Sequence, residues 1–227
     1  MNYLFPPLIP SVPIADSDSA LAVHRVYCVG KNYVDHAREM GGDPSREPPC
    51  FFSKPADAVV HGREEIPFPG HTGKLHYEVE LVVALGKGGR NVAVDDAADL
   101  ILGYGVGIDL TRRDLQDDAK KAGRPWDVAK GFDNSAPLSA IHRVARTGIL
   151  DRAEISLTVN GEIRQQGNIA DMTWGVAEII AELSTYFTLR EGDLIFTGTP
   201  AGVGPLQVGD RVVATVEGID QLAIRLV

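Results

Sequence analysis

The sequence predicts a mixed α/β domain that is mostly β, with many short strands and a few short helices. Runs rich in β-branched and aromatic residues recur along the 227-residue chain, and turn-forming residues separate them. In the C-terminal half, residues 155–159 and 163–166 flank Asn160-Gly161, a strong signal for a two-residue hairpin turn. This pattern argues against a parallel doubly wound sheet and against a helical bundle.

The N-terminal half begins with a predicted extended arm over residues 1–20, which contain four prolines. A single domain is expected over 21–227, starting with a strand at 23–29 and a short helix at 32–40. The strand at 75–86 is the clearest element, because its apolar residues alternate and glycine ends it. Its wholly apolar face consists of Tyr77, Val79, Leu81, Val83 and Leu85.

A helix at 95–102 and a strand at 103–110 are expected next. The latter strand has glycine at alternate positions, which indicates that a backbone or a ligand approaches closely. Thr111 is expected to cap a helix at 112–121. The later elements are an amphipathic helix at 174–187, a loop at 197–204, and strands at 194–196, 211–216 and 221–227.

Composition restricts the class of partner and the compartment. A net charge of -9 and a pI of about 5.1 argue against nucleic acid, because no surplus of basic residues can neutralise phosphates. The sequence contains no run of ~18 apolar residues, so it predicts no membrane span. The prolines of the first segment argue against a signal peptide, and two cysteines argue against a disulfide framework. We therefore expect a cytoplasmic protein.

Glu78 and Glu80 share the second face of the strand at 75–86, with Cα atoms about 6.5–7 Å apart. Two carboxylates this close repel each other and lose hydration if they are buried, and a divalent cation would remove both costs. The alternative is an exposed strand end with two solvated glutamates. Asp109 on the following strand is a third candidate ligand, or else an aspartate that caps a turn or helix, and Gly105 and Gly107 on its face predict open space around its carboxylate. Oxygen ligands favour Mg²⁺, Mn²⁺ or Ca²⁺ over zinc.

His36 and Glu39 lie three residues apart, so a helix places them on one face. A carboxylate beside an imidazole raises its basicity, as a base that activates water requires. Gly30 and Gly41-Gly42 flank this helix and suit a mobile lid. The alternative is a surface pair with no role.

Four further residues are candidates for binding an anionic substrate. Lys130 follows a mostly apolar stretch and either faces an anion or extends to water. Arg113 and Gln116 share one helix face near Asp109, although Arg113 could equally pair with a nearby acid. Thr199 lies in a loop whose hydroxyls and N–H groups suit small anions, or which is a simple connection.

Together these segments resemble the fumarylacetoacetate hydrolase family over residues 24–227. The matching segments are 30–39 (GKNYVDHARE), 53–55 (SKP), 77–81 (YEVEL), 103–116, 126–132 (WDVAKGF), 159–165 and 192–204. The chain is most similar to the short single-domain branch of acylpyruvases and fumarylpyruvate hydrolases, including those of gentisate breakdown.

The resemblance implies a mixed β-roll with short helices, usually as a homodimer. It implies Mg²⁺ or Mn²⁺ held by Glu78, Glu80 and Asp109. It also implies a water-activating dyad and an oxyanion-stabilising lysine. The positions that match the dyad are His36 and Glu39, and the position that matches the lysine is Lys130. The positions that match substrate contacts are Arg113, Gln116, Thr199 and Lys54.

The expected reaction is hydrolysis of a C–C bond in a 2,4-dioxo acid to pyruvate and a carboxylic acid, in aromatic catabolism. Decarboxylation of oxaloacetate, or isomerisation of an oxo-acid, is an alternative that would use the same metal. A non-catalytic protein that binds oxo-acids or metal is a second alternative, but plain binding needs no general base.

Overall fold

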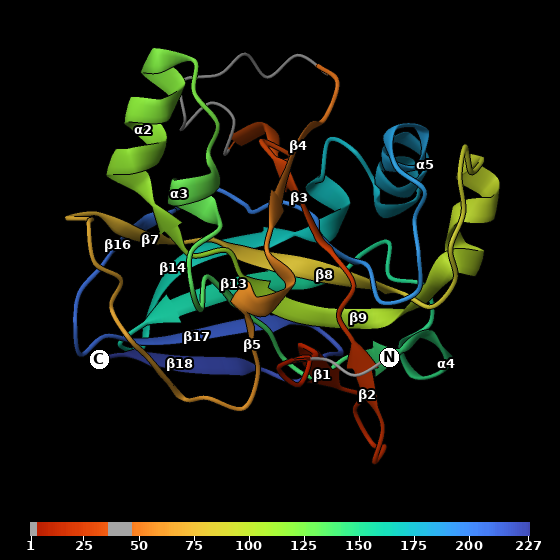
Figure 1. Cartoon of the computed structure of the whole chain (residues 1–227), viewed down its shortest axis with the longest axis horizontal. Coiled ribbons are helices and arrows are strands. Elements are labelled where there is room, and N and C mark those ends of the chain that lie inside the picture. The colour runs from red at the N-terminus through yellow and green to blue at the C-terminus, as the bar shows by residue number, and fades with distance from the viewer. Residues whose placement is uncertain (1–3, 36–46) are drawn as a thin grey trace.

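The computed structural model describes residues 4–35 and 47–227, and it confirms the mostly β prediction. Its largest sheet has six strands in the order β12-β9-β8-β15-β3-β4 (Figure 1). Neighbouring strands in this sheet are antiparallel except β15 and β3. These strands are β12 (His142–Arg143), β9 (Ile101–Ile108), β8 (Val79–Leu85), β15 (Leu194–Phe196), β3 (Val26–Gly30) and β4 (Cys50–Lys54).

A five-stranded sheet in the order β14-β13-β17-β18-β6 packs beside β8 and β9. Its strands are β14 (Glu162–Asn168), β13 (Glu154–Val159), β17 (Arg211–Val216), β18 (Leu222–Leu226) and β6 (Glu65–Ile66). Asn160 and Gly161 join β13 to β14 with φ angles of 53° and 85°. Both angles are positive, as the predicted tight hairpin turn requires, so this part of the prediction is confirmed.

Two hydrophobic clusters bury the central strand β8 from both sides. The apolar face predicted from the sequence packs in the larger cluster, together with Leu157 and Val212 of the five-stranded sheet. Val82 and Ala84 of the opposite face pack in the smaller cluster against Phe196. A strand buried on both faces tolerates charge only where specific partners compensate it.

Smaller elements surround the two large sheets. A three-stranded sheet contains β10 (Thr111–Arg112), β7 (Leu75–Tyr77) and β16 (Gly204–Leu206). Two further sheets have two strands each: β11 (Ala136–Pro137) pairs with β5 (Val59–Val60), and β1 (Ser11–Pro13) pairs with β2 (Ala20–Ala22). The α-helices are α2 (Arg113–Ala122), α3 (Asp127–Lys130), α4 (Val144–Thr147) and α5 (Val176–Tyr186), and the 3₁₀ helices are η1 (Ala56–Ala58), η2 (Val94–Leu100) and η3 (Ile169–Asp171). Within the described ranges, no helix has the length and apolar character to cross a membrane.

Several predicted elements differ in detail from the structure. The strand predicted at 75–86 is two strands, β7 and β8, which separate at Glu78 and join different sheets. Thr111 does not cap α2, because it is itself part of strand β10 and Arg112 precedes the helix. Part of the predicted extended arm is the β1–β2 hairpin. The predicted loop at 197–204 leads directly into β16.

The glycines of β9 do not create open space around Asp109, so that prediction is wrong. A Cβ added at Gly107 would lie 2.6 Å from a ring atom of Phe196 and 2.7 Å from Cγ2 of Val82. A Cβ added at Gly105 would lie 3.1 Å from the Cδ1 atoms of Ile141 and Leu138. Neighbouring apolar side chains occupy the space, so the close approach predicted for this strand comes from the protein's own core.

Gly107→Ala should destabilise the fold by about 1–3 kcal/mol, because its methyl group would overlap buried side chains that have little room to move. Urea unfolding followed by circular dichroism measures the loss. Gly70→Ala is the matched control, because no atom lies within 4 Å of a Cβ at Gly70. Equal unfolding midpoints for the two variants would contradict this packing.

Candidate metal and oxo-acid site

Antiparallel pairing of β8 with β9 brings the three predicted metal ligands together. Val79 lies opposite Ile108 and Glu80 opposite Gly107, so Asp109 follows next to Glu78. The backbone N–H of Asp109 donates to the carbonyl oxygen of Glu78 at 2.8 Å. One oxygen from each of the Glu78, Glu80 and Asp109 carboxylates lies within 4.8 Å of the others. All three residues are buried, so an exposed strand end with solvated glutamates is excluded.

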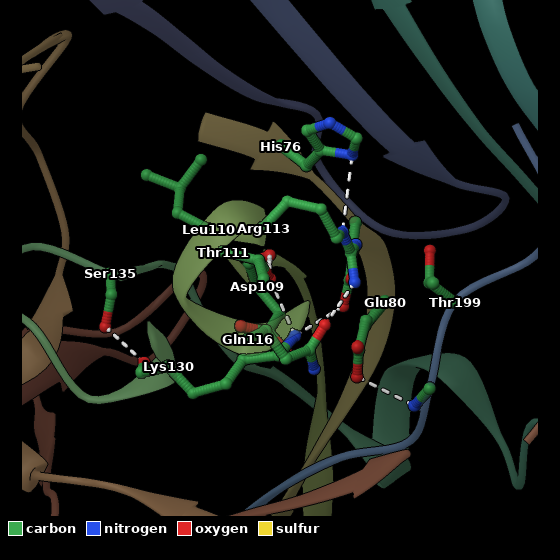
Figure 2. Close-up of polar contacts among 12 residues, drawn as sticks. His76, Glu80, Asp109, Leu110, Thr111, Arg113, Gln116, Lys130, Ser135 and Thr199 are labelled. Atoms are coloured by element: carbon green, nitrogen blue, oxygen red, sulfur yellow. Dashed lines mark hydrogen bonds and ion pairs between the residues drawn. The ribbon is translucent and has the colours of Figure 1, made fainter. Parts of the chain in front are cut away.

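Lys130 compensates two of these carboxylates directly. Its Nζ donates to Oε2 of Glu78 at 2.7 Å, to Oδ2 of Asp109 at 2.6 Å and to Oγ1 of Thr111 at 2.6 Å (Figure 2). An ammonium group has three N–H donors, and all three are therefore engaged. Burial acts to lower the pKa of Lys130, but the charges of Asp109 and Glu78 outweigh it and hold that pKa above its usual value.

Arg113, the first residue of α2, forms a buried ion pair with Glu78. The guanidinium also donates to Oε1 of Gln116 at 2.5 Å and lies 3.4 Å from Nδ1 of His76 (Figure 2). Burial and the charge of Arg113 lower the pKa of His76 to about 4, so its imidazole is neutral near pH 7. The neutral ring can accept from Arg113, which orients the guanidinium towards Glu78.

Lys54 lies behind the carboxylates instead of facing a substrate. Its Nζ is 2.8 Å from Oδ1 of Asp109, and it donates to the carbonyl oxygens of Leu110 and Lys130. The side chain is fully buried. Because the ammonium group is fully buried among three protein oxygens and Lys54 does not line the cleft above the carboxylates, the expected substrate contact of Lys54 does not fit this structure, and the residue instead neutralises Asp109.

Glu80 is held differently from the other two carboxylates. Its Oε2 accepts from the backbone N–H of Gly198 at 2.7 Å (Figure 2), and no cationic side chain of the described residues pairs with it. Burial, followed by the charges of Asp109 and Glu78, raises the pKa of Glu80 well above its usual value. A cation bound beside Glu80 would favour its charged form.

The donor set fits a hard divalent cation. All three candidate ligands are carboxylates, and oxygen ligands are those that Mg²⁺ and Mn²⁺ prefer. Within the part of the chain that the structure describes, the buried Oδ1 of Asp109 accepts no hydrogen bond, although Lys54 lies close to it. A buried carboxylate oxygen that accepts no hydrogen bond keeps a lone pair that can coordinate a metal.

A cleft opens above these carboxylates. Lys130 and the three predicted contacts for the oxo-acid end line it, together with other residues. The lining residues that carry the argument are Glu78, Glu80, Arg113, Gln116, Lys130 and Thr199. One cleft thus presents two candidate ligands beside cationic and neutral donors, an arrangement suited to a small anionic molecule that also contacts the metal.

Two buried residues that support the site were missed in the sequence. Nε2 of Gln165 donates to Oγ1 of Thr199 at 2.8 Å, and its Oε1 accepts from the N–H of Val79 at 3.0 Å. The side chain of Asn32 donates to the carbonyl oxygen of Thr197 at 2.8 Å. This bond connects the first residue of the predicted lid helix to the loop before β16. Neither residue carries a periodic or spacing signal, so only the tertiary structure reveals these bonds.

His36 and Glu39 lie outside the described residues. The water-activating dyad and the lid helix therefore stay predictions. Asn32, four residues before His36, is fixed by a second set of bonds, with Trp174, at 2.8 and 3.0 Å. The described chain thus anchors the start of this segment at the side of the cleft.

Comparison with known proteins places this architecture in a family. The model of the fumarylacetoacetate (FAA) hydrolase C-terminal family matches residues 25–227. The chain is 47% identical to oxaloacetate tautomerase YcgM of Escherichia coli over 86% of its own length and 90% of that protein. It is 43% identical to a fumarylpyruvate hydrolase of a Ralstonia species, over 80% of this chain and 94% of that one.

Among solved structures, the fumarylpyruvate hydrolase from Pseudomonas aeruginosa in complex with Mn²⁺ and pyruvate matches with a TM-score of 0.97. The sequence identity is 49%, and the match covers 100% of this chain and 99% of the other. A family model over most of the sequence, close relatives and a nearly identical fold agree with one another. The chain belongs to the fumarylacetoacetate hydrolase family.

Proposed function

We propose that the protein is a divalent-metal-dependent hydrolase that cleaves a C–C bond in a 2,4-dioxo acid, fumarylpyruvate or another acylpyruvate. The observation that carries the proposal is the single cleft in which the carboxylate cluster meets Arg113, Gln116, Thr199 and Lys130. The relatives from Ralstonia and Pseudomonas are named fumarylpyruvate hydrolases, and the latter was solved with Mn²⁺ and pyruvate. Pyruvate is the 2-oxo acid that this reaction releases.

Four residues that line the cleft, together with the predicted dyad, have roles suited to that reaction. Arg113, Gln116 and Thr199 bind and orient the oxo-acid end of the substrate. His36, held by Glu39, takes a proton from the attacking water, and the distal carbonyl becomes an oxyanion. Lys130, which lines the cleft, would exchange one of its three protein contacts to become the cationic partner of this oxyanion.

Glu78, Glu80 and Asp109 would hold Mg²⁺ or Mn²⁺. When bound, the ion supplies positive charge at the oxo-acid end, where negative charge develops as the C–C bond breaks. The cytoplasmic location, the homodimer and the place in gentisate breakdown remain predictions from the resemblance and the composition.

Oxaloacetate tautomerisation is the second candidate, because the relative from Escherichia coli with 47% identity is named for it. Oxaloacetate also carries a carboxylate next to a 2-oxo group, so it suits the same residues. Tautomerisation moves a proton between carbon and oxygen and requires no attacking water. The two reactions therefore differ in their need for a water-activating base at His36.

Glu80→Gln should weaken Mn²⁺ binding by roughly 100-fold or more, because losing even an orienting partner of a metal ligand costs about 10–100-fold. Glutamine can still accept from the N–H of Gly198, so the fold should persist. Calorimetric titration of the metal-free protein measures the affinity. Glu65→Gln, at an exposed position on β6, is the control and should bind like the wild type. Undiminished affinity in Glu80→Gln would remove this residue from the ligand set.

A steady-state comparison of fumarylpyruvate, acetylpyruvate and oxaloacetate with Mg²⁺ tests the reaction itself. His36→Ala should reduce kcat for hydrolysis by roughly 10²–10⁴-fold, the usual contribution of a general base. Glu39→Gln should give a smaller loss in the same direction. Hydrolysis at the wild-type rate in His36→Ala would refute the role of this histidine. Turnover of oxaloacetate alone by the wild type would favour the tautomerase.

A further inference from the structure

Helix α2 carries two of the predicted oxo-acid contacts, Arg113 and Gln116, and has Lys120 in its last turn. Arg113, Gln116 and Lys120 are spaced three and four residues apart, so they lie on one side of the helix. All three line the cleft. Lys120 is four residues, or about 6 Å, beyond Gln116 along the helix axis. A molecule bound at Arg113 and Gln116 and extending outwards would therefore meet the ammonium group of Lys120.

Lys120 is oriented by an aromatic ring, and no acidic side chain of the described residues pairs with it. Its Nζ lies 5.4 Å from the ring centroid of Trp126, which also lines the cleft and packs on Phe52 with ring centroids 5.7 Å apart. Among the described residues, no carboxylate forms an ion pair with Lys120. Burial and the charge of Arg113 lower the pKa of Lys120, as expected for a cation that is not neutralised by its neighbours.

Lys31 adds a second positive charge to the same part of the cleft. It follows β3 with a φ of 59°, an unusual backbone conformation for lysine, and the buried Asn32 holds the next position. Burial raises the pKa of the Cys50 thiol, and the positive charges of Lys31 and Lys120 partly oppose that rise. Both lysines therefore lie near Cys50. The described carboxylates that line the cleft are Glu78 and Glu80, and both belong to the metal cluster.

We propose that Lys120, supported by Trp126 and joined by Lys31, binds a second carboxylate at the end of the substrate far from the metal ligands. This subsite makes the enzyme selective for dicarboxylic over monocarboxylic 2,4-dioxo acids. The inference rests on the proposed function, because it assumes that the oxo-acid end binds at Arg113 and Gln116. It names the feature of the substrate that the distal half of the cleft recognises.

Lys120→Met tests the subsite, because methionine keeps an unbranched side chain and removes the charge. For fumarylpyruvate, which has a distal carboxylate, kcat/KM should fall roughly 10- to 100-fold, the usual loss for one charge-assisted hydrogen bond, mainly through KM. For acetylpyruvate, which has none, it should change less than about twofold. Lys121→Met is the control, because Lys121 is also an exposed lysine in the last turn of α2 but does not line the cleft.

A measurement without turnover separates this inference from the proposed function. Calorimetry on the Mn²⁺-loaded protein compares 2-oxoheptanedioate with 2-oxoheptanoate, which differ only in the distal carboxylate. The wild type and Lys121→Met should prefer the diacid, and Lys120→Met should lose that preference. A wild type that binds both acids equally, or a Lys120→Met variant that keeps the preference, would overturn the subsite even if hydrolysis is observed. A wild type that prefers the diacid but cleaves no dioxo acid would refute the proposed function and leave the subsite supported.

Discussion

The structure depends on compensating three carboxylates that are buried together at the junction of β8 and β9. Unpaired, these charges would be costly in a strand pair that packs into the core on both faces. Lys54 from β4, Arg113 from α2 and Lys130 from α3 supply three cations, each from a different element. β4, α2 and α3 therefore each place a positively charged group beside the buried carboxylates.

This balance changes the reason why the site should hold a metal. In the sequence, a divalent cation is the simplest remedy for repulsion between Glu78 and Glu80. In the structure, ion pairs already neutralise Glu78 and Asp109, and only Glu80 relies on a backbone N–H. Three carboxylates and three cations sum to zero, so most of the charge of a bound dication would remain available to an anionic substrate. That surplus suits chemistry in which negative charge develops at the oxo-acid end.

The sequence predicts the local features well, because alternation, turn residues and helix spacing are local properties. It thereby identifies the apolar face of β8, the hairpin at Asn160 and the three carboxylates. Features that depend on distant partners are not predictable in this way. The side chain of Phe196 fills the space beside Gly107, and Lys54 turns inward only because Asp109 lies behind it. Gln165 supports Thr199 across 34 positions of sequence, and no pattern within one segment encodes such a bond.

The two ends of the cleft are linked through a single helix. Pairing of Thr111 with His76 fixes the start of α2, and the next residues place Arg113 beside Glu78. From there the helix is rigid, and Lys120 is about 10 Å further along its axis. A shift in the β10–β7 register would therefore move the contacts for both ends of a substrate together. In the proposed binding mode, the contacts for the oxo-acid end and for the distal carboxylate consequently have one structural origin, which is the register of the two-residue strand β10 against β7.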